Sequence, residues 1–139
     1  MNLGKTVVVV LIVILLTSGI TQIVYSRYKY LSTKNIPVYV EVVSGSHIGL
    51  NTRTDGLYFG KIPMGDSGRR FLTINNEHRS DSEVLIATSE EVADWMIPSD
   101  NKFILHPGES KDMTVDIFIP TNASVGNYTG KMTVYLTRA

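Results

Sequence analysis

Three histidines, His47, His78 and His106, are the only imidazole groups that could bind a metal ion or transfer a proton. Metal ligands that form a sequence motif are usually about two to five residues apart. No two of these histidines have that spacing, and each falls in a different predicted turn. They could still converge in space, but solvated histidines are the simpler interpretation. Because the chain has no cysteine, thiolate ligands, thiol nucleophiles and disulfides are excluded, and we expect neither a metal nor a cofactor.

The serines do not form a recognisable hydrolase motif. A serine nucleophile on a sharp turn usually lies in a Gly-x-Ser-x-Gly pattern, which Gly45-Ser46 and Ser67-Gly68 lack. The chain also has no glycine-rich phosphate loop of the Walker type. We therefore expect a protein that is not an enzyme.

Several carboxylates gather around one predicted strand and the turn that follows it. Paired acids can perform acid–base catalysis or bind calcium. The spacing lacks the alternating aspartates of a calcium-binding loop, so the acids are interpreted as a solvated acidic face. They are Asp81, Glu83, Glu90, Glu91 and Asp94.

Two adjacent arginines, Arg69 and Arg70, are the candidate binding residues. Guanidinium groups recognise phosphates and carboxylates, so the pair could contact an acidic partner. The alternation of a β-strand places one of the two outward, where an ordinary surface role is the alternative. The formal net charge of the whole chain is zero, and the absence of a basic excess argues against nucleic acid as a partner.

Two glycosylation sequons follow one another near the C-terminus, at Asn122-Ala123-Ser124 and Asn127-Tyr128-Thr129. Chance alone gives about this many in a chain with 8 Asn and 25 Ser plus Thr among 139 residues. Asn122 and Asn127 are therefore conditional glycosylation candidates, relevant only if this part of the chain lies outside the cytoplasm.

An apolar N-terminal segment precedes all of these candidate residues and would place them relative to a membrane. Between Lys5 and Arg27 lie 21 residues without a charge, and as a helix they would span roughly 32 Å, close to the ~30 Å hydrocarbon core of a bilayer. Tyrosines beside Arg27 and Lys29 are typical of the interface at the end of a spanning helix. We predict an anchor within residues 1–27 that contacts the membrane through residues 6–26. A cleaved signal peptide and a buried soluble helix are the alternatives.

The charges are unevenly divided along the chain. Residues 1–34 contain four basic residues and no acid, which gives +4; the remaining residues contain nine basic and 13 acidic residues, which gives −4. Counting flanking bases leans slightly toward a cytoplasmic C-terminal side. The short N-terminal flank before the apolar run is instead typical of export signals. We expect the N-terminus inside and the domain outside, with the reverse topology as the alternative.

The rest of the chain has the pattern of a small β-protein. Aliphatic or Met residues recur at every second position over Val38–Val42, Val84–Ile86, Met113–Ile119 and Met132–Leu136, and clusters of Gly, Pro, Asn and Ser bound these runs. About seven short strands of this kind predict an all-β fold, an Ig-like antiparallel β-sandwich over residues 37–139, joined to the helix by a tether over residues 28–36. One helical turn is expected near Ser89–Ala93, and Trp95 is expected in the core.

Two segments carry a family resemblance. LYFGKIPMGDSGRRFLTINN, from Leu57 to Asn76, resembles the opening of Ig-like modules grouped around the major sperm protein and ASH domains. FILHPGESKDMTVDIFIPTNASVGNYTGKMTVYL, from Phe103 to Leu136, resembles the last strands of such sandwiches and of NEW3-type modules on secreted and archaeal surface proteins. In this pattern Gly108 marks a tight turn, Gly126 the last hairpin corner, and Tyr128 a core or corner aromatic. These are fold signals rather than active-site residues.

The absence of a catalytic pattern predicts a function in binding or assembly, because sandwiches of this kind usually present their edges and loops to partners. An N-terminal anchor plus one sandwich is similar in plan to small archaeal membrane proteins and to archaellum stator subunits. We expect a single-pass protein whose extracytoplasmic domain binds a protein or an envelope polymer. The alternatives are a cytoplasm-facing adaptor of the major sperm protein type and an accessory subunit of a surface filament.

Overall fold

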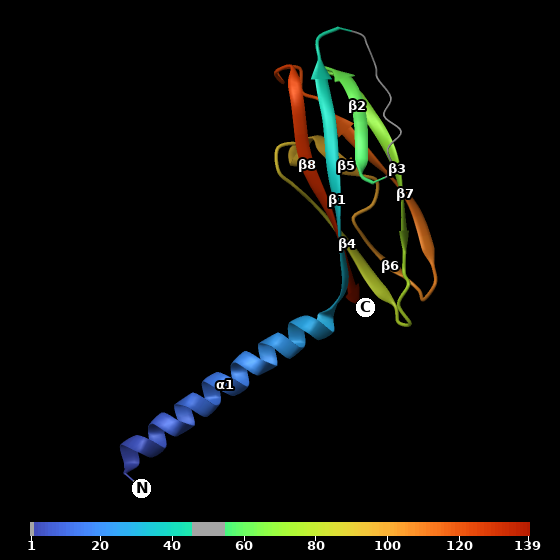
Figure 1. The fold of residues 1–139 in the computed structure, drawn as a ribbon. Coiled ribbons are helices and arrows are strands. Elements are labelled where there is room, and N and C mark those ends of the chain that lie inside the picture. Colours follow the sequence, from blue (N-terminus) through green and yellow to red (C-terminus); the bar gives the residue numbers. More distant parts are fainter. Residues whose placement is uncertain (1, 46–54) are drawn as a thin grey trace.

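The computed structural model describes residues 2–45 and 55–139, which form one helix followed by eight strands in two sheets. The prediction of an all-β sandwich preceded by an apolar N-terminal helix is confirmed. Figure 1 shows the helix extending from one end of the sandwich, with the C-terminus beside the point where the helix meets it.

Helix α1 comprises Leu3–Lys29 and buries none of its residues. It is long and apolar enough to cross a membrane. Its few hydroxyl groups bond back to carbonyls one turn earlier: Thr17 Oγ1 donates to the Val13 carbonyl at 2.8 Å and Thr21 Oγ1 to the Thr17 carbonyl at 2.8 Å. These hydroxyl groups therefore need no partner outside the helix.

Strand β1, Tyr30–Val43, begins at the residue after the helix ends. The structure thus differs from the expected tether over residues 28–36, because most of that segment is already in the sheet, with Tyr30 opposite Thr137 and Asn35 opposite Thr133. The polar run Ser32–Asn35 hides this strand in the sequence, since it lacks the apolar alternation that begins at Ile36.

The larger sheet has the order β2-β1-β8-β4-β6. Three of its four strand pairs are antiparallel, but β1 and β2 run parallel, which departs from the purely antiparallel sandwich expected. The other strands are β2 (Leu57–Pro63), β4 (Ser82–Ser89), β6 (Lys102–Leu105) and β8 (Gly126–Arg138).

The smaller sheet has the order β3-β7-β5 and is antiparallel throughout. Its strands are β3 (Ser67–Asn75), β7 (Ser110–Phe118) and β5 (Met96–Pro98). A short 3-10 helix, η1 (Ala93–Trp95), precedes β5, slightly later than the single turn expected near Ser89–Ala93.

The core fills the space between the two sheets with aliphatic side chains from alternate positions of the strands. Trp95 is half-buried at its margin, with its ring centroid 4.9 Å from that of Tyr128. The Tyr128 hydroxyl donates to the Ser124 carbonyl at 2.9 Å, a contact similar to the tyrosine corner of Ig-like sandwiches. Residues with no exposed surface include Val38, Val42, Val84, Val92, Val115, Ile117 and Met132.

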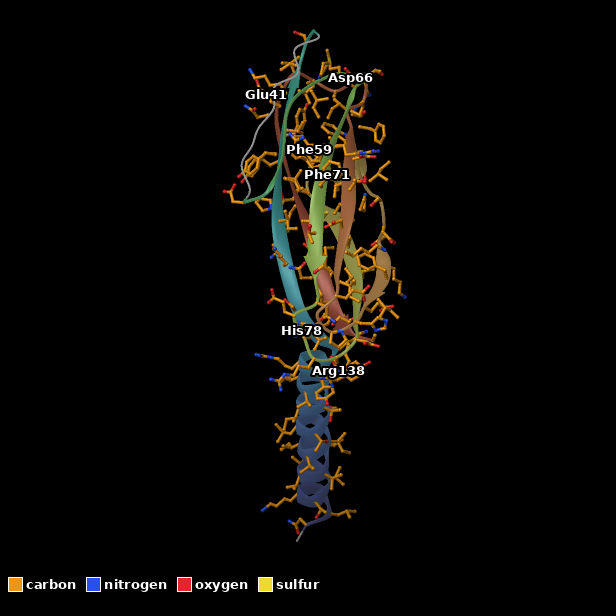
Figure 2. All side chains as sticks on the ribbon, turned by 90° about the vertical axis from the view of Figure 1, so that its right-hand side faces the viewer. Glu41, Phe59, Asp66, Phe71, His78 and Arg138 are labelled. Atoms are coloured by element: carbon orange, nitrogen blue, oxygen red, sulfur yellow. The ribbon has the colours of Figure 1, made fainter. Side chains whose placement is uncertain are left out.

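The end of the sandwich that adjoins α1 is here called the helix-proximal end. Strand pairing brings together the start of β1, the end of β8, the β3–β4 turn over residues 76–81 and the β6–β7 turn over residues 106–109. Figure 2 shows His78 and Arg138 at this end, and Asp66 at the opposite end.

Candidate interaction surface

The outward face of the smaller sheet carries large apolar side chains that no described element covers. The exposed fractions are 79% for Phe71 on β3, 51% for Phe118 on β7 and 56% for Ile97 on β5. Arg69, Asp116 and Ile97 lie in one row across the three strands. These residues, Arg69, Phe71, Ile97, Asp116 and Phe118, are called the outer face below. In Figure 2 Phe71 lies on the outside of the sandwich, whereas Phe59 is buried between the sheets.

A bidentate ion pair lies in the middle of the outer face. Arg69 Nε donates to Asp116 Oδ1 at 2.6 Å, and Nη2 donates to Oδ2 at 2.8 Å. The hydrogen bonds from Arg69, aided by its charge, lower the pKa of Asp116 although partial burial opposes this shift. Both groups are therefore charged at neutral pH and hold each other in place, which leaves a polar centre between the apolar side chains.

Arg70 lies on the opposite side of the same strand and is half-buried. Its Nε donates to the Tyr58 carbonyl at 2.6 Å and its Nη1 to the Arg69 carbonyl at 3.0 Å. The guanidinium carbon is 5.8 Å from the centroid of the Phe59 ring. Strand alternation therefore separates the two candidate arginines: Arg69 is on the surface with its carboxylate, and Arg70 is tied to the protein's own backbone.

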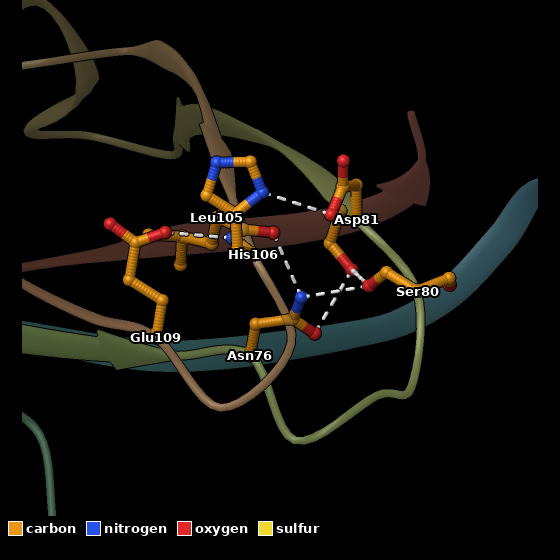
Figure 3. Close-up of polar contacts among 7 residues, drawn as sticks. Asn76, Ser80, Asp81, Leu105, His106 and Glu109 are labelled. Atoms are coloured by element: carbon orange, nitrogen blue, oxygen red, sulfur yellow. Dashed lines mark hydrogen bonds and ion pairs between the residues drawn. The ribbon is translucent and has the colours of Figure 1, made fainter.

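A buried asparagine joins the two turns of the helix-proximal end (Figure 3). Asn76, 1% exposed, donates from Nδ2 to the carbonyls of Ser80 and Leu105, both at 2.9 Å. Its Oδ1 accepts from the His78 N–H and the Ser82 hydroxyl, both at 3.0 Å. All four hydrogen-bonding positions of the amide are thus filled inside the protein, which makes Asn76 a structural link and not a ligand site.

The two described histidines lie in these same turns. His106 Nδ1 is 3.0 Å from Asp81 Oδ1, and its backbone N–H donates to Glu109 Oε2 at 2.7 Å. The hydrogen bond to Asp81, with the charges of Asp81 and Glu109, raises the pKa of His106. His47 lies outside the described residues. Within the described residues no group of three or more His, Asp or Glu side chains is arranged to hold a metal ion.

The acidic side chains between Asp81 and Glu91 are each engaged with a different partner. Glu83 pairs with Lys102 at 3.2 Å, Glu90 pairs with Lys131 at 3.8 Å, and Glu91 accepts from the Thr129 N–H at 3.2 Å. No two of these carboxylates share a partner among the contacts of the described residues. This arrangement matches an acidic surface better than a carboxylate pair.

Basic residues near the helix lack such partners. Among the described residues, the lysines and arginines that form ion pairs all lie in the body of the sandwich: Lys61, Arg69, Lys102, Lys111 and Lys131. The described bases at or beside the helix-proximal end form none: Arg27, Lys29, Lys34, Arg79 and Arg138. Arg138 instead stacks on Tyr28 in the last turns of α1, with its guanidinium carbon 4.3 Å from the ring centroid.

Both sequon asparagines are exposed. Asn122 lies in the turn between β7 and β8, and Asn127 is the second residue of β8, opposite Glu41. Their accessibility is compatible with glycosylation, and the modification stays a conditional prediction for both.

No protein-family model matches the chain, and no curated protein matches it. The fold is therefore described from the structure alone, and the resemblance to the major sperm protein, ASH and NEW3-type modules stays a prediction.

Sequence reasoning did not identify the outer face as a surface of interest. The sequence does contain a signal. Phe71 is two residues from both Arg69 and Thr73, and Phe118 is two residues from Asp116, so each phenylalanine shares a strand face with polar residues. A large apolar residue that alternates in step with polar ones is placed on the solvent side of a strand.

Proposed function

We propose that this protein is a non-catalytic, single-pass membrane protein whose β-sandwich binds a protein or an envelope polymer outside the cytoplasm. Residues 6–26 would form the retained anchor. The outer face would provide the contact with the partner.

The observation that carries this proposal is the exposure of Phe71, Ile97 and Phe118 on one face of one sheet. Several large apolar side chains exposed on one face of a folded domain mark a site of interaction, because leaving them in water is unfavourable. The central pair of Arg69 and Asp116 adds a polar group that can orient a partner.

Retention of the helix is supported by its continuity. Helix α1 runs without interruption through Thr17-Ser18-Gly19, where a signal peptide would be cut, and continues to Lys29. Cleavage there would leave a half-helix attached to β1. The resemblance to NEW3-type surface modules supports the outside placement, whereas the resemblance to the major sperm protein supports the cytoplasmic adaptor.

Single-cysteine labelling tests the topology, since the natural chain has no cysteine. Asn122→Cys places a thiol on an exposed turn, and Met132→Cys, at a fully buried position, serves as the control that labels only after unfolding. We expect an impermeant maleimide to label Asn122→Cys in intact cells. Labelling only after lysis would contradict the outside placement and support the adaptor. The mass of the labelled chain checks that residues 1–27 are retained.

Site-specific photo-crosslinking tests the binding function. A photoreactive residue at position 71 should form adducts in intact cells, whereas one at position 85 should not. Leu85 is a suitable control because it is 44% exposed but belongs to β4 of the other sheet. The Arg69→Asp variant, which places two carboxylates side by side, should remove the adducts at position 71. Equal adducts at both positions would exclude the outer face as the specific contact.

A further inference from the structure

Half of strand β1 has a neighbour on one side only. Strand β2 pairs with β1 from Val38 onward, whereas β8 pairs with β1 from Tyr30. Within the described residues, residues 30–37 of β1 therefore form an open sheet edge. Unpaired main-chain groups at such an edge are a template for another strand.

The direction of the main-chain groups along this edge follows from the hydrogen-bond pattern of the sheet. The Ile86 N–H donates to Asn101 on the β6 side, so its neighbour Ala87 faces β8. Thr133 lies opposite Ala87, so its N–H and C=O groups point to β4. Asn35 lies opposite Thr133 on the other side of β8, so the main-chain groups of Asn35 point away from β8. By the same alternation Thr33 also directs its N–H and C=O groups to the open side.

A groove of about 260 Å³ lies beside this edge, between β1 and the end of β3. Figure 2 shows this side of the molecule, with β8 behind the space between β1 and β3. The groove is open because the smaller sheet does not cover the first residues of β1. Its apolar lining comes from Ile36, Leu72, Ile74, Val134 and Leu136.

Lys34 also lines the groove and has an unusual position. It lies on the same face of β1 as Ile36 and Val38, whose side chains point into the core. Lys34 is nevertheless exposed, and it forms no ion pair with a described residue. Inward-pointing charges and prolines at an edge protect it from indiscriminate pairing, and Pro37 is the second such device. Glu77 and His78 line the groove as well, but no ion pair joins Lys34 to Glu77, so the Lys34 amine is available to a carboxylate of a bound strand.

We propose that this groove binds an extended segment of a partner protein, which adds to β1 as a strand. The segment would hydrogen-bond to Thr33 and Asn35, place apolar side chains against Leu72 and Ile74, and place an Asp or Glu beside Lys34. This inference goes beyond the contact proposed for the outer face, because it concerns a second surface and gives the chemistry of the segment that binds there. Main-chain bonds supply affinity, and the charge pair selects the segment.

A second copy of this chain is a poorer occupant. Two copies anchored side by side in one membrane would have β1 strands that run in the same direction, related by a two-fold axis parallel to the strands. Thr33 of one copy would then lie opposite Thr33 of the other. In a parallel ladder a residue bonds instead to the two residues that flank its opposite neighbour. The symmetric arrangement therefore does not produce a regular ladder.

Synthetic peptides added to the full chain in detergent micelles provide the test. The probe is acetyl-Ser-Glu-Thr-Val-Thr-Val-Thr-amide, tested also in reversed order because either strand direction is compatible with the edge. The matched control replaces its Glu with Lys. Hydrogen exchange measured by mass spectrometry should show protection of residues 30–37, and the Lys peptide should bind at least tenfold more weakly. Absence of protection at millimolar peptide, or equal binding of both peptides, would overturn the proposal.

Two variants test the edge and the charge separately. Thr33→Pro removes an N–H that makes no bond within the sheet, so the melting temperature should fall by no more than a few degrees while peptide affinity falls at least tenfold. Lys34→Glu should reverse the preference, so that the Lys peptide binds better than the Glu peptide. If Thr33→Pro does not fold, the reversal by Lys34→Glu decides alone. Wild-type affinity in a folded Thr33→Pro, or no reversal, contradicts strand addition.

The remaining outcomes separate this inference from the proposed function. Adducts at position 71 without peptide binding would overturn the groove proposal and leave the binding function standing. Peptide binding without adducts would support the groove and count against the outer face. Concentration-dependent protection of residues 30–37 without peptide would show that a second copy occupies the groove, against the proposal.

Discussion

Val92 places its Cγ2 atom 2.3 Å from the position that a β-carbon on Gly130 would occupy. Gly130 lies in β8 opposite Val38, and Val92 is fully buried just before η1. The absence of a side chain at Gly130 therefore lets the segment between β4 and β5 pack against the central strand of the larger sheet.

Gly130→Ala should lower the free energy of unfolding by about 1–3 kcal/mol, because the added methyl group overpacks a fully buried site. Gly126→Ala, in the same strand with nothing within 4 Å of its β-carbon position, should change stability little. The Val92→Ala background should reduce the cost of Gly130→Ala. Thermal unfolding followed by the fluorescence of Trp95, the single tryptophan, measures all three. Equal effects of the two glycine variants would contradict the close packing.

Asn76→Ala should destabilise the protein by roughly 3 kcal/mol, because buried partners lose hydrogen bonds and stay out of water. The affected groups are the carbonyls of Ser80 and Leu105 and the Ser82 hydroxyl. Asn75→Ala is the matched control, since its side chain is exposed, and it should stay within about 0.5 kcal/mol of the wild type. Chemical denaturation in detergent gives both values. A loss below about 1 kcal/mol for Asn76→Ala would show that the turns hold without the amide.

Phe71→Ser should leave the free energy of unfolding within about 0.5 kcal/mol of the wild type, because Phe71 is exposed. Phe59→Ala, at a residue that is 3% exposed, should cost about 3–5 kcal/mol. Thermal unfolding of the two variants in detergent measures both changes in stability, and it distinguishes a phenylalanine available for binding from one needed for folding. A large loss for Phe71→Ser would assign the outer face to stability instead of binding.

The pair of His106 and Asp81 should make stability depend on pH. Because the hydrogen bond and charge of Asp81 raise the pKa of His106 in the folded state, the contribution is complete below about pH 6.5 and is lost as the pH rises through the raised value. The Asp81→Asn variant should therefore be less stable than the wild type near pH 5.5 and approach it near pH 9. Melting temperatures at the two pH values test this, and a difference that does not change with pH would exclude the pair as its source.

The parts of the fold that could be predicted from the sequence are those in which one local pattern decides. The uncharged run between Lys5 and Arg27 predicts the apolar helix, and the alternation around Val38, Val115 and Val134 predicts strands with one buried face. These patterns are strong because burial acts on every second residue of such a strand.

The remaining features depend on contacts between distant segments. The first half of β1 carries Ser32, Thr33, Lys34 and Asn35, and its strand conformation is determined by β8, about a hundred residues away. The parallel pairing of β1 with β2 likewise depends on chain connections, not on residue type. The outer face requires knowing that β3, β7 and β5 are neighbours in one sheet, because alternation places Phe71 and Phe118 on the solvent side of their strands without bringing the strands together.

The direct passage from α1 into β1 has a mechanical consequence. With α1 held in a membrane as proposed, a pull on the sandwich would load β1 along its own length, and 12 residue pairs connect β1 to β8. The hydrogen bonds of a sheet lie perpendicular to its strands, so this load shears many of them at once and does not peel them one by one. Tension along the helix would therefore meet the longest strand pairing among the described residues.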